Sequence, residues 1–198
     1  MSSAQDLVDT PVPAVNIYKN VFNLDDVNRF INHIEEECAD RNGGLYWDDS
    51  FIGNGNLSDY RSSLACNLDL FMDPRQDSPV KQLFMESIAR KIVECAEDYC
   101  EQYTVGHGMH EPFNLLKYSA GAHYRSHYDY GPNMHRIFSI VAYLKNTSTG
   151  GDLELPFFNT IIKAEENSVL VFPSSYPYTH YAHPVIDGVK YSLVTWYR

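Results

Sequence analysis

The sequence predicts an α+β protein, dominated by β-structure, in which an antiparallel double-sheet jelly roll is buttressed by N-terminal helices. In the N-terminal half, two stretches carry apolar residues at helical spacing. From Pro112 onward the pattern changes to short apolar or alternating runs separated by turn residues, which is typical of a sandwich or jelly roll. The 15 tyrosines and 10 phenylalanines are enriched toward this second half, where they favour sheet over a helical bundle.

A single domain is expected over residues 1–198, because this length suffices for one sizeable hydrophobic core. Residues 1–13 contain Pro11 and Pro13 and few large apolar residues, which indicates a loose arm or an edge segment. Residues 14–111 are expected to supply helical support and a long loop. Residues 112–198 are expected to form the jelly-roll core.

Two helices are expected before residue 112. A short strand at residues 15–18 precedes the first helix, which Asn23 can cap and which Asn42-Gly43-Gly44 ends. Its apolar positions are Leu24, Val27, Phe30, Ile31 and Ile34. Ser78-Pro79 opens the second helix, which runs to about Tyr103. Residues 43–62 between the helices are rich in Gly, Asn, Asp and Ser, and a loop of this length is often functional, for example as a lid.

Five longer strands are expected in the second half. They cover residues 113–118, 137–144, 153–157, 168–172 and 191–197. Turn clusters separate them at 119–121, 146–151, 165–167 and 187–188. The sequence contains no internal repeat.

Composition disfavours several classes of partner. There are 15 Lys and Arg against 26 Asp and Glu, a net charge of −11, and no basic run, so a nucleic-acid partner is not expected. The chain starts without a basic and apolar leader and contains no apolar run of membrane-spanning length, so we expect a cytoplasmic protein without a membrane partner. The four cysteines lack metal or disulfide spacing and are expected to be buried free thiols.

The tripeptide His127-Tyr128-Asp129 offers an imidazole and a carboxylate two positions apart. Because side chains alternate along a strand, residues 127 and 129 point to one face if the strand ends there, as Tyr130-Gly131-Pro132 indicates. Two imidazoles and one carboxylate on one face of an iron(II) ion leave its other face open for chemistry. The tripeptide therefore predicts a metal site that needs one more histidine.

Of the eight histidines, His180 and His183 lie nearest to a strand end in the C-terminal part of the chain. The spacing alone leaves both of them open as the third ligand. His33, His107 and His110 are expected to have structural roles, because a lone histidine is more often a surface or hydrogen-bonded group than a ligand.

The order of motifs between residues 114 and 196 resembles the catalytic core of Fe(II)- and 2-oxoglutarate-dependent dioxygenases, in particular the prolyl 4-hydroxylase-like group. The matching motifs are Tyr118, His127-x-Asp129, Arg136 before Tyr143-Leu144, Gly150-Gly151-Asp152-Leu153-Glu154-Leu155-Pro156, Phe172-Pro173, His180, Pro184-Val185-Ile186-Asp187-Gly188 and Lys190-Tyr191. Arg61-Ser62-Ser63 also resembles an R-T-S segment of the substrate-binding region, which implies that the loop 43–62 lies on the substrate side.

The resemblance implies which residues hold the metal. The family places its distal histidine four residues before the proline of the P-V motif, here Pro184, and this position is His180. His127, Asp129 and His180 are therefore expected to bind Fe(II). His183 stays open as a contributor.

The resemblance also implies a cosubstrate site. Lys190 is expected to bind the far carboxylate of 2-oxoglutarate, because a carboxylate removed from water needs a cation. Tyr118 and Tyr143 either hydrogen-bond this cosubstrate or only pack. Arg136 either positions the substrate or forms a structural salt bridge. Trp196 is expected to belong to the core.

The function implied by the resemblance is hydroxylation of a prolyl residue in a peptide or protein. This reaction uses Fe(II), 2-oxoglutarate and O2, releases succinate and CO2, and can need ascorbate to keep the iron reduced. The alternatives are the same chemistry on a free amino acid, small metabolite or alkylated nucleic acid, and a non-catalytic metal-binding jelly-roll module. The excess of acidic residues disfavours an alkylated nucleic acid as the substrate. Lys190 disfavours the non-catalytic module, because a protein that only binds a metal needs no cation beside it.

Overall fold

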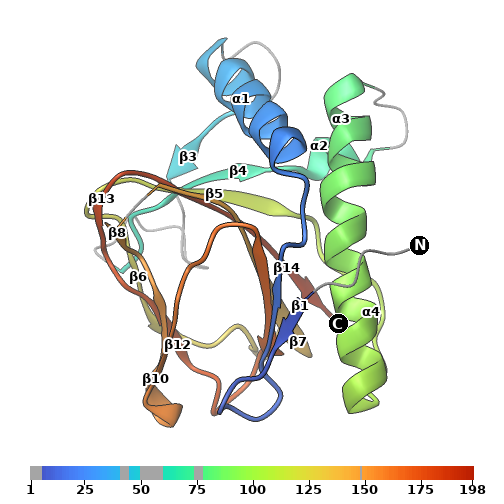
Figure 1. Ribbon diagram of the computed structural model, residues 1–198, viewed down its shortest axis with the longest axis vertical. Coiled ribbons are helices and arrows are strands. Elements are labelled where there is room, and N and C mark those ends of the chain that lie inside the picture. Colours follow the sequence, from blue (N-terminus) through green and yellow to red (C-terminus); the bar gives the residue numbers. More distant parts are fainter. Residues whose placement is uncertain (1–5, 41–44, 50–59, 74–77, 148) are drawn as a thin grey trace.

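The computed structural model describes residues 6–40, 45–49, 60–73, 78–147 and 149–198. In this part of the chain two antiparallel sheets form a barrel-like body, with the first long helix above it and the second along its right side in the view of Figure 1. The predicted α+β jelly roll with N-terminal helices is confirmed.

The main sheet has eight strands in the order β1-β2-β11-β7-β14-β5-β4-β3. The bounds are β1 Asp6–Val8, β2 Asn16–Lys19, β3 Asp48–Asp49, β4 Leu64–Asn67, β5 Asn114–Tyr118, β7 Phe138–Asn146, β11 Ser168–Pro173 and β14 Lys190–Tyr197. A second sheet has the order β10-β9-β12-β6, and β8 pairs with β13. The bounds here are β6 Tyr124–His127, β8 Thr149–Gly150, β9 Leu153–Leu155, β10 Thr160–Ile162, β12 His180–Ala182 and β13 Val185–Asp187.

The first helix, α1, spans Leu24–Asp40. The Asn23 side chain accepts hydrogen bonds from the backbone N–H groups of Asp25 and Asp26, at 2.9 and 3.2 Å, and so caps the helix as predicted. The predicted end at residues 42–44 lies outside the described residues. A short helix, α2, covers Asp69–Met72.

The second long helix consists of α3 (Pro79–Leu83), a π-helical stretch (Phe84–Ala89) and α4 (Arg90–Tyr103). Ser78 caps its start by accepting from the Lys81 N–H at 3.2 Å. It ends where Thr104 takes a left-handed conformation, with φ of 53°. Start and end agree with the prediction.

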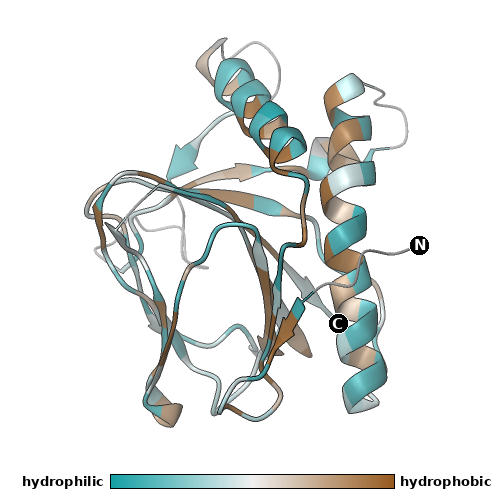
Figure 2. Cartoon of the chain, viewed as in Figure 1, coloured by the Kyte–Doolittle hydropathy of each residue, from teal (hydrophilic) through white to brown (hydrophobic). Residues whose placement is uncertain are grey.

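Both faces of the central strands β7, β11 and β14 of the main sheet are largely buried. In β11, Val169 and Val171 belong to the large core beneath the helices, whereas Leu170 and Phe172 face the interior between the sheets. Figure 2 shows hydrophilic and hydrophobic bands along α1 and α4, as expected for helices that cover a sheet with one face. The interior face of this sheet carries the site described below.

The N-terminal part contributes more to the sheet than the sequence predicts. Residues 6–8 form the edge strand β1, paired with β2, which agrees with the edge segment expected as one of the two alternatives for residues 1–13. Strands β1–β4 all join the main sheet, so the expected boundary at residue 112 does not divide it. The structure describes only the ends of the loop 43–62, where β3 pairs with β4, and the expected lid lies largely outside the described residues. Among the described residues, no helix combines the length and apolar character that crossing a bilayer requires.

Candidate metal centre

Strand pairing brings the two predicted histidine ligands together. His127 is the last residue of β6 and His180 the first of β12, and the two residues lie opposite each other in the antiparallel register. Asp129 follows two residues later in a bend, so the strand ends earlier than the tripeptide alone indicates. One potential ligand atom from each of the three side chains lies within 4.8 Å of the others. Residues far apart in sequence thus form one cluster.

Backbone carbonyls orient both imidazole rings. Nδ1 of His127 lies 2.8 Å from the carbonyl oxygen of Arg125, and Nδ1 of His180 lies 3.1 Å from that of Tyr178. When each Nδ1–H donates to its carbonyl, each Nε2 is left with a free lone pair. The two Nε2 atoms each lie 3.7 Å from a carboxylate oxygen of Asp129. The three potential metal ligands are therefore close enough to bind one ion.

Asp129 is held by two serines. The Ser139 hydroxyl lies 2.7 Å from Oδ2 of Asp129 and 2.8 Å from the hydroxyl of Ser174. The backbone carbonyl of Ser174 accepts from the N–H groups of Asp129 and Tyr130, each at 3.0 Å. The carboxylate is therefore fixed by the neighbouring ends of β7 and β11.

The charges of the cluster suit a divalent cation. Burial, reinforced by the nearby His180, lowers the pKa of His127 to about 3. Burial opposes ionisation of Asp129, but the two imidazoles, the Ser139 hydroxyl and the Trp196 indole outweigh it, so the pKa of this carboxyl is lowered. At neutral pH the cluster thus offers a neutral imidazole and a carboxylate, the forms in which these groups bind metal.

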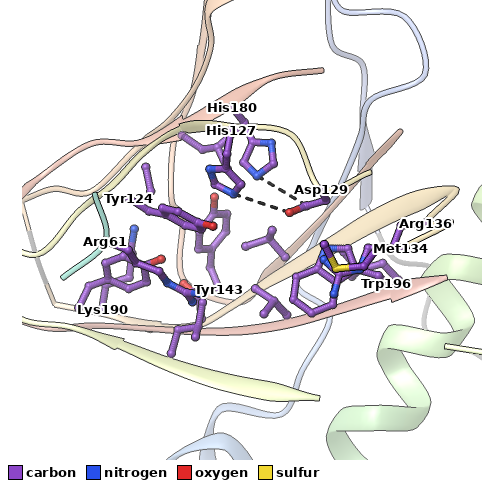
Figure 3. Close-up of a pocket in the computed structure, with 18 residues that line it drawn as sticks. Arg61, Tyr124, His127, Asp129, Met134, Arg136, Tyr143, His180, Lys190 and Trp196 are labelled. Atoms are coloured by element: carbon purple, nitrogen blue, oxygen red, sulfur yellow. Dashed lines mark ion pairs between the residues drawn. The ribbon is translucent and has the colours of Figure 1, made fainter. Parts of the chain in front are cut away.

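A cavity of about 270 Å³ opens beside the three ligands, just below the ~300–1,000 Å³ range of ligand pockets. Figure 3 shows the ligands along the upper wall of the cavity, with Lys190 and Tyr143 below them. Apolar side chains, among them Leu116, Val141 and Val194, complete the walls.

Lys190 is a buried cation that has no acidic partner among the described residues. Its side chain is 2 % exposed, its Nζ donates to the carbonyl oxygen of Gly151, and no carboxylate pairs with it in the described part of the chain. Burial lowers the pKa of Lys190 to about 8, although Asp152 acts in the opposite direction. Asp152 is itself bonded to Lys163, 2.5 Å away. A buried ammonium group of this kind is stabilised by an anionic ligand in the cavity.

Tyr118 and Tyr143 lie beside this ammonium group. The Nζ atom of Lys190 is 4.3 Å from the ring centre of Tyr118 and 5.9 Å from that of Tyr143. Both tyrosines are buried and line the cavity. Burial raises the pKa of Tyr143, so its hydroxyl keeps its proton and can donate a hydrogen bond to a ligand.

Three cavity residues were not predicted as site residues. Ser192 and Trp196 follow Lys190 at even spacing on β14 and line the same cavity. The Ser192 hydroxyl is buried and has no hydrogen-bond partner among the described residues. Trp196 packs against a buried apolar cluster, as expected for a core residue, and its indole also forms a hydrogen bond with Asp129. Tyr124 stacks on the imidazole of His127 with 3.6 Å between ring centres.

Arg136 lines the cavity but its charge is already paired. Its Nε and Nη2 atoms donate to the two carboxylate oxygens of Glu111, at 2.9 and 2.6 Å. Its guanidinium also lies 3.7 Å from the ring centre of Trp196. The structural salt bridge expected as one alternative is thus present, at the edge of the cavity.

His183 lies outside the ligand cluster. Its Nε2 atom is 2.8 Å from a carboxylate oxygen of Glu154, and the metal-ligand cluster found among the described residues contains His180 instead. His180 is therefore the third member of the triad.

Two imidazoles and one carboxylate at the wall of a jelly-roll cavity define the class of 2-His-1-carboxylate metal proteins, and this donor set fits Fe(II). Residues 113–198 match the model of the 2OG-Fe(II) oxygenase superfamily, so this part of the chain is similar to that superfamily. Lys190 and Ser192 fit the dicarboxylate cosubstrate of the superfamily. They offer the cavity a buried cation without a paired carboxylate and a buried hydroxyl without a partner among the described residues.

Two curated relatives come from Arabidopsis thaliana. The chain is 31 % identical to probable prolyl 4-hydroxylase 9 over 117 residues, which cover 44 % of this chain and 41 % of the relative. It is 27 % identical to prolyl 4-hydroxylase 13 over 118 residues, which cover 45 % of this chain and 43 % of the relative. The chain thus spans less than half the length of these relatives.

Solved structures share the fold at lower identity. A prolyl-4-hydroxylase of Pseudomonas putida has a TM-score of 0.68 at 18 % identity, with 93 % of this chain and 92 % of that chain covered. A Trichoplax adhaerens prolyl hydroxylase, in complex with a peptide of hypoxia inducible factor, has a TM-score of 0.70 at 14 % identity, with 93 % and 83 % covered. The viral collagen prolyl hydroxylase of Paramecium Bursaria Chlorella virus-1 has a TM-score of 0.63 at 16 % identity, with 93 % and 96 % covered.

Proposed function

We propose that this protein hydroxylates a prolyl residue of a peptide or protein, using Fe(II), 2-oxoglutarate and O2 and releasing succinate and CO2. The observation that carries the proposal is the pairing of two features in one cavity. The triad His127, Asp129 and His180 offers a metal three ligands on one side, and Lys190 offers a buried cation to a dicarboxylate.

The triad residues are proposed to hold Fe(II), which together with 2-oxoglutarate supplies the oxidising chemistry when both are bound. Ser139 and the indole of Trp196 keep the Asp129 carboxylate ionised and in a fixed orientation. The carbonyls behind Nδ1 of both histidines keep each Nε2 turned to the metal.

Lys190 is proposed to bind the far carboxylate of 2-oxoglutarate. The hydroxyls of Tyr118, Tyr143 and Ser192 lie in the same cavity and can donate to the same carboxylate. The apolar walls exclude water, which strengthens each of these charge-assisted hydrogen bonds.

The choice of a prolyl substrate is supported by the relatives, several of which bear the name prolyl hydroxylase. A free amino acid or small metabolite is the second candidate. The open groove beside the cavity, of about 680 Å³, favours an extended substrate over a small one. Arg136 is proposed to position the substrate at the junction of cavity and groove, where it lines both.

The proposal is tested by incubating the protein with Fe(II), ascorbate, 2-oxoglutarate and proline-containing peptides. We expect succinate above background and a peptide product heavier by one oxygen atom, located on proline by fragmentation. Succinate without a peptide product would remove the prolyl assignment. Neither product, with iron bound, would favour the non-catalytic module.

A further inference from the structure

A groove of about 680 Å³ joins the metal cavity. The groove and the cavity share parts of their walls, namely Arg61, Leu116, Arg136, Val194 and Trp196. A polypeptide that places a residue at the metal centre would therefore continue along this groove.

The floor of the groove is a face of the main sheet. On β4, Ala65 and Asn67 line the groove, whereas Cys66 between them is buried in the core beneath the helices. On β5, Asn114 lies in the groove at the position paired with Asn67. The edge strand β3 closes the far side, and the two asparagine side chains offer amide groups that can bond to a peptide backbone.

Three aspartates give this groove a negative charge. Asp48 and Asp49 of β3 and Asp69 of α2 line it, and all three are exposed. Within the described part of the chain none of them forms an ion pair. Asp48 accepts from the N–H of Asp49, and Asp69 accepts from the side-chain amide of Asn67, each at 2.9 Å, so the donors on these two carboxylates are neutral groups.

The positive charges in the walls do not fully offset these aspartates. Arg136 is paired with Glu111, 2.6 Å away, a carboxylate that it shares with Arg198, so this cluster offsets only part of the charge of the three aspartates. Arg61 lies at the inner end, with its guanidinium 4.6 Å from the ring centre of Tyr124 and its Nε bonded to Ser63. The groove is therefore acidic in the part of its wall that it does not share with the metal cavity.

We propose that this groove binds the segment of a polypeptide substrate next to its target residue and selects lysine or arginine there. The proposal rests on the proposed function, which it deepens by naming a class of substrate, a peptide with basic residues near proline. Charge complementarity in a solvent-accessible groove affects selectivity and encounter more than total affinity.

Acidic residues at these positions can also act without any bound substrate. Charged side chains on an edge strand protect a sheet from pairing with a second chain. In addition, the net charge of −11 attracts basic peptides to the whole surface. Protection of the sheet edge and general attraction by the net charge do not require the three groove aspartates to contact a peptide. A variant that removes these three charges is therefore compared with one that removes three charges elsewhere.

The test compares three short peptides of alanine and glycine with one central proline, flanked on both sides by lysine, glutamine or glutamate. Turnover by the Fe(II)- and 2-oxoglutarate-loaded protein gives kcat/KM for each, and fluorescence anisotropy of labelled peptides gives each Kd. We expect kcat/KM to be about tenfold higher for the lysine than for the glutamate peptide, mainly through KM, because each exposed charge pair contributes little. The difference should shrink as salt is added.

The variant Asp48→Asn/Asp49→Asn/Asp69→Asn removes the three groove charges. The matched control, Glu36→Gln/Glu86→Gln/Glu97→Gln, removes three exposed charges from the helices and changes net charge equally. We expect the groove variant to reduce the preference to about twofold or less and the control to keep most of it.

The outcomes separate this inference from the proposed function. Hydroxylation of all three peptides with equal kcat/KM would overturn the groove inference and leave the function standing, and so would a preference that persists in the groove variant. If no peptide is hydroxylated, the assignment of a prolyl substrate is contradicted. In that case, binding of the lysine peptide that is lost in the groove variant would still support the selection of basic residues by the groove. Absence of both binding and turnover overturns the two together.

Discussion

His127 and His180 face each other across the antiparallel pair β6 and β12, with 4.1 Å between their ring centres. This register places both Nε2 atoms beside Asp129, at 3.7 Å each. Because the two rings are fixed by strand pairing and by backbone carbonyls, the donor set is preorganised before any metal binds.

This arrangement predicts that His180, and not His183, is required for iron. His180→Ala removes one of three ligands, and we expect it to lose most of the bound iron, measured by metal analysis after desalting. His183→Ala is the matched control, because it removes a histidine that bonds Glu154 outside the cluster. Full iron retention in His180→Ala would overturn the assignment.

Ser139 is expected to tune iron affinity through Asp129. Ser139→Ala removes the hydroxyl that lies 2.7 Å from Oδ2, and loss of such a partner lowers metal affinity roughly tenfold to a hundredfold. Ser168→Ala is the control, since it also removes a buried hydroxyl from the main sheet but one that bonds the carbonyl of Glu165. Equal iron affinity in both variants would contradict the role of Ser139.

Lys190→Met is expected to raise the KM for 2-oxoglutarate by at least about a hundredfold, because a buried carboxylate would lose its cation. The same variant should unfold at a higher temperature than the wild type when no ligand is present, since it removes a buried charge for which the described part of the chain offers no acidic partner. Lys163→Met, which removes an exposed lysine, is the control for both measurements. An unchanged KM in Lys190→Met would remove the cosubstrate role.

The pH dependence of stability follows from the same residue. Burial lowers the pKa of Lys190 from 10.5 to about 8, so the unfolded chain binds more protons than the folded chain between these values. The free energy of unfolding of the ligand-free protein should therefore rise with pH from about 8 to 10.5, relative to Lys190→Met, in denaturant titrations. Affinity for 2-oxoglutarate should fall above pH 8, because the cation is then lost. A wild-type curve parallel to that of Lys190→Met would contradict this expectation.

Ser192→Ala is expected to weaken 2-oxoglutarate binding severalfold without destabilising the ligand-free protein. The hydroxyl is buried and has no partner among the described residues, so its removal leaves no group unsatisfied there. Thermal unfolding without and with 2-oxoglutarate separates the two effects. A loss of stability without ligand, with unchanged affinity, would show that the hydroxyl is structural.

Local patterns made much of this structure predictable. Asn23 and Ser78 could be recognised as caps because their side chains bond nearby backbone groups, which depends on few distant contacts. The triad could be recognised because its order along the chain matches a family pattern. Ser192 and Trp196 could have been predicted as cavity residues, because side chains alternate along a strand and both residues stand at an even spacing from Lys190 on the last strand.

Other features depend on pairings that no local pattern contains. Strands β4, β8, β12 and β13 have two to four residues, too few to show a period, and are defined only by their partners. The stacking of Tyr124 on His127 and the bonding of Arg136 to Glu111 likewise require the fold to be known.

The most direct test of the central claim is an anaerobic titration of 2-oxoglutarate into the Fe(II)-loaded protein, followed by the weak visible absorption that chelation of the iron produces. We predict a saturable band in the wild type, and a band in Lys190→Met that needs a much higher concentration of 2-oxoglutarate. Iron-loaded wild-type protein that develops no band would contradict the cosubstrate site and favour a metal-binding module.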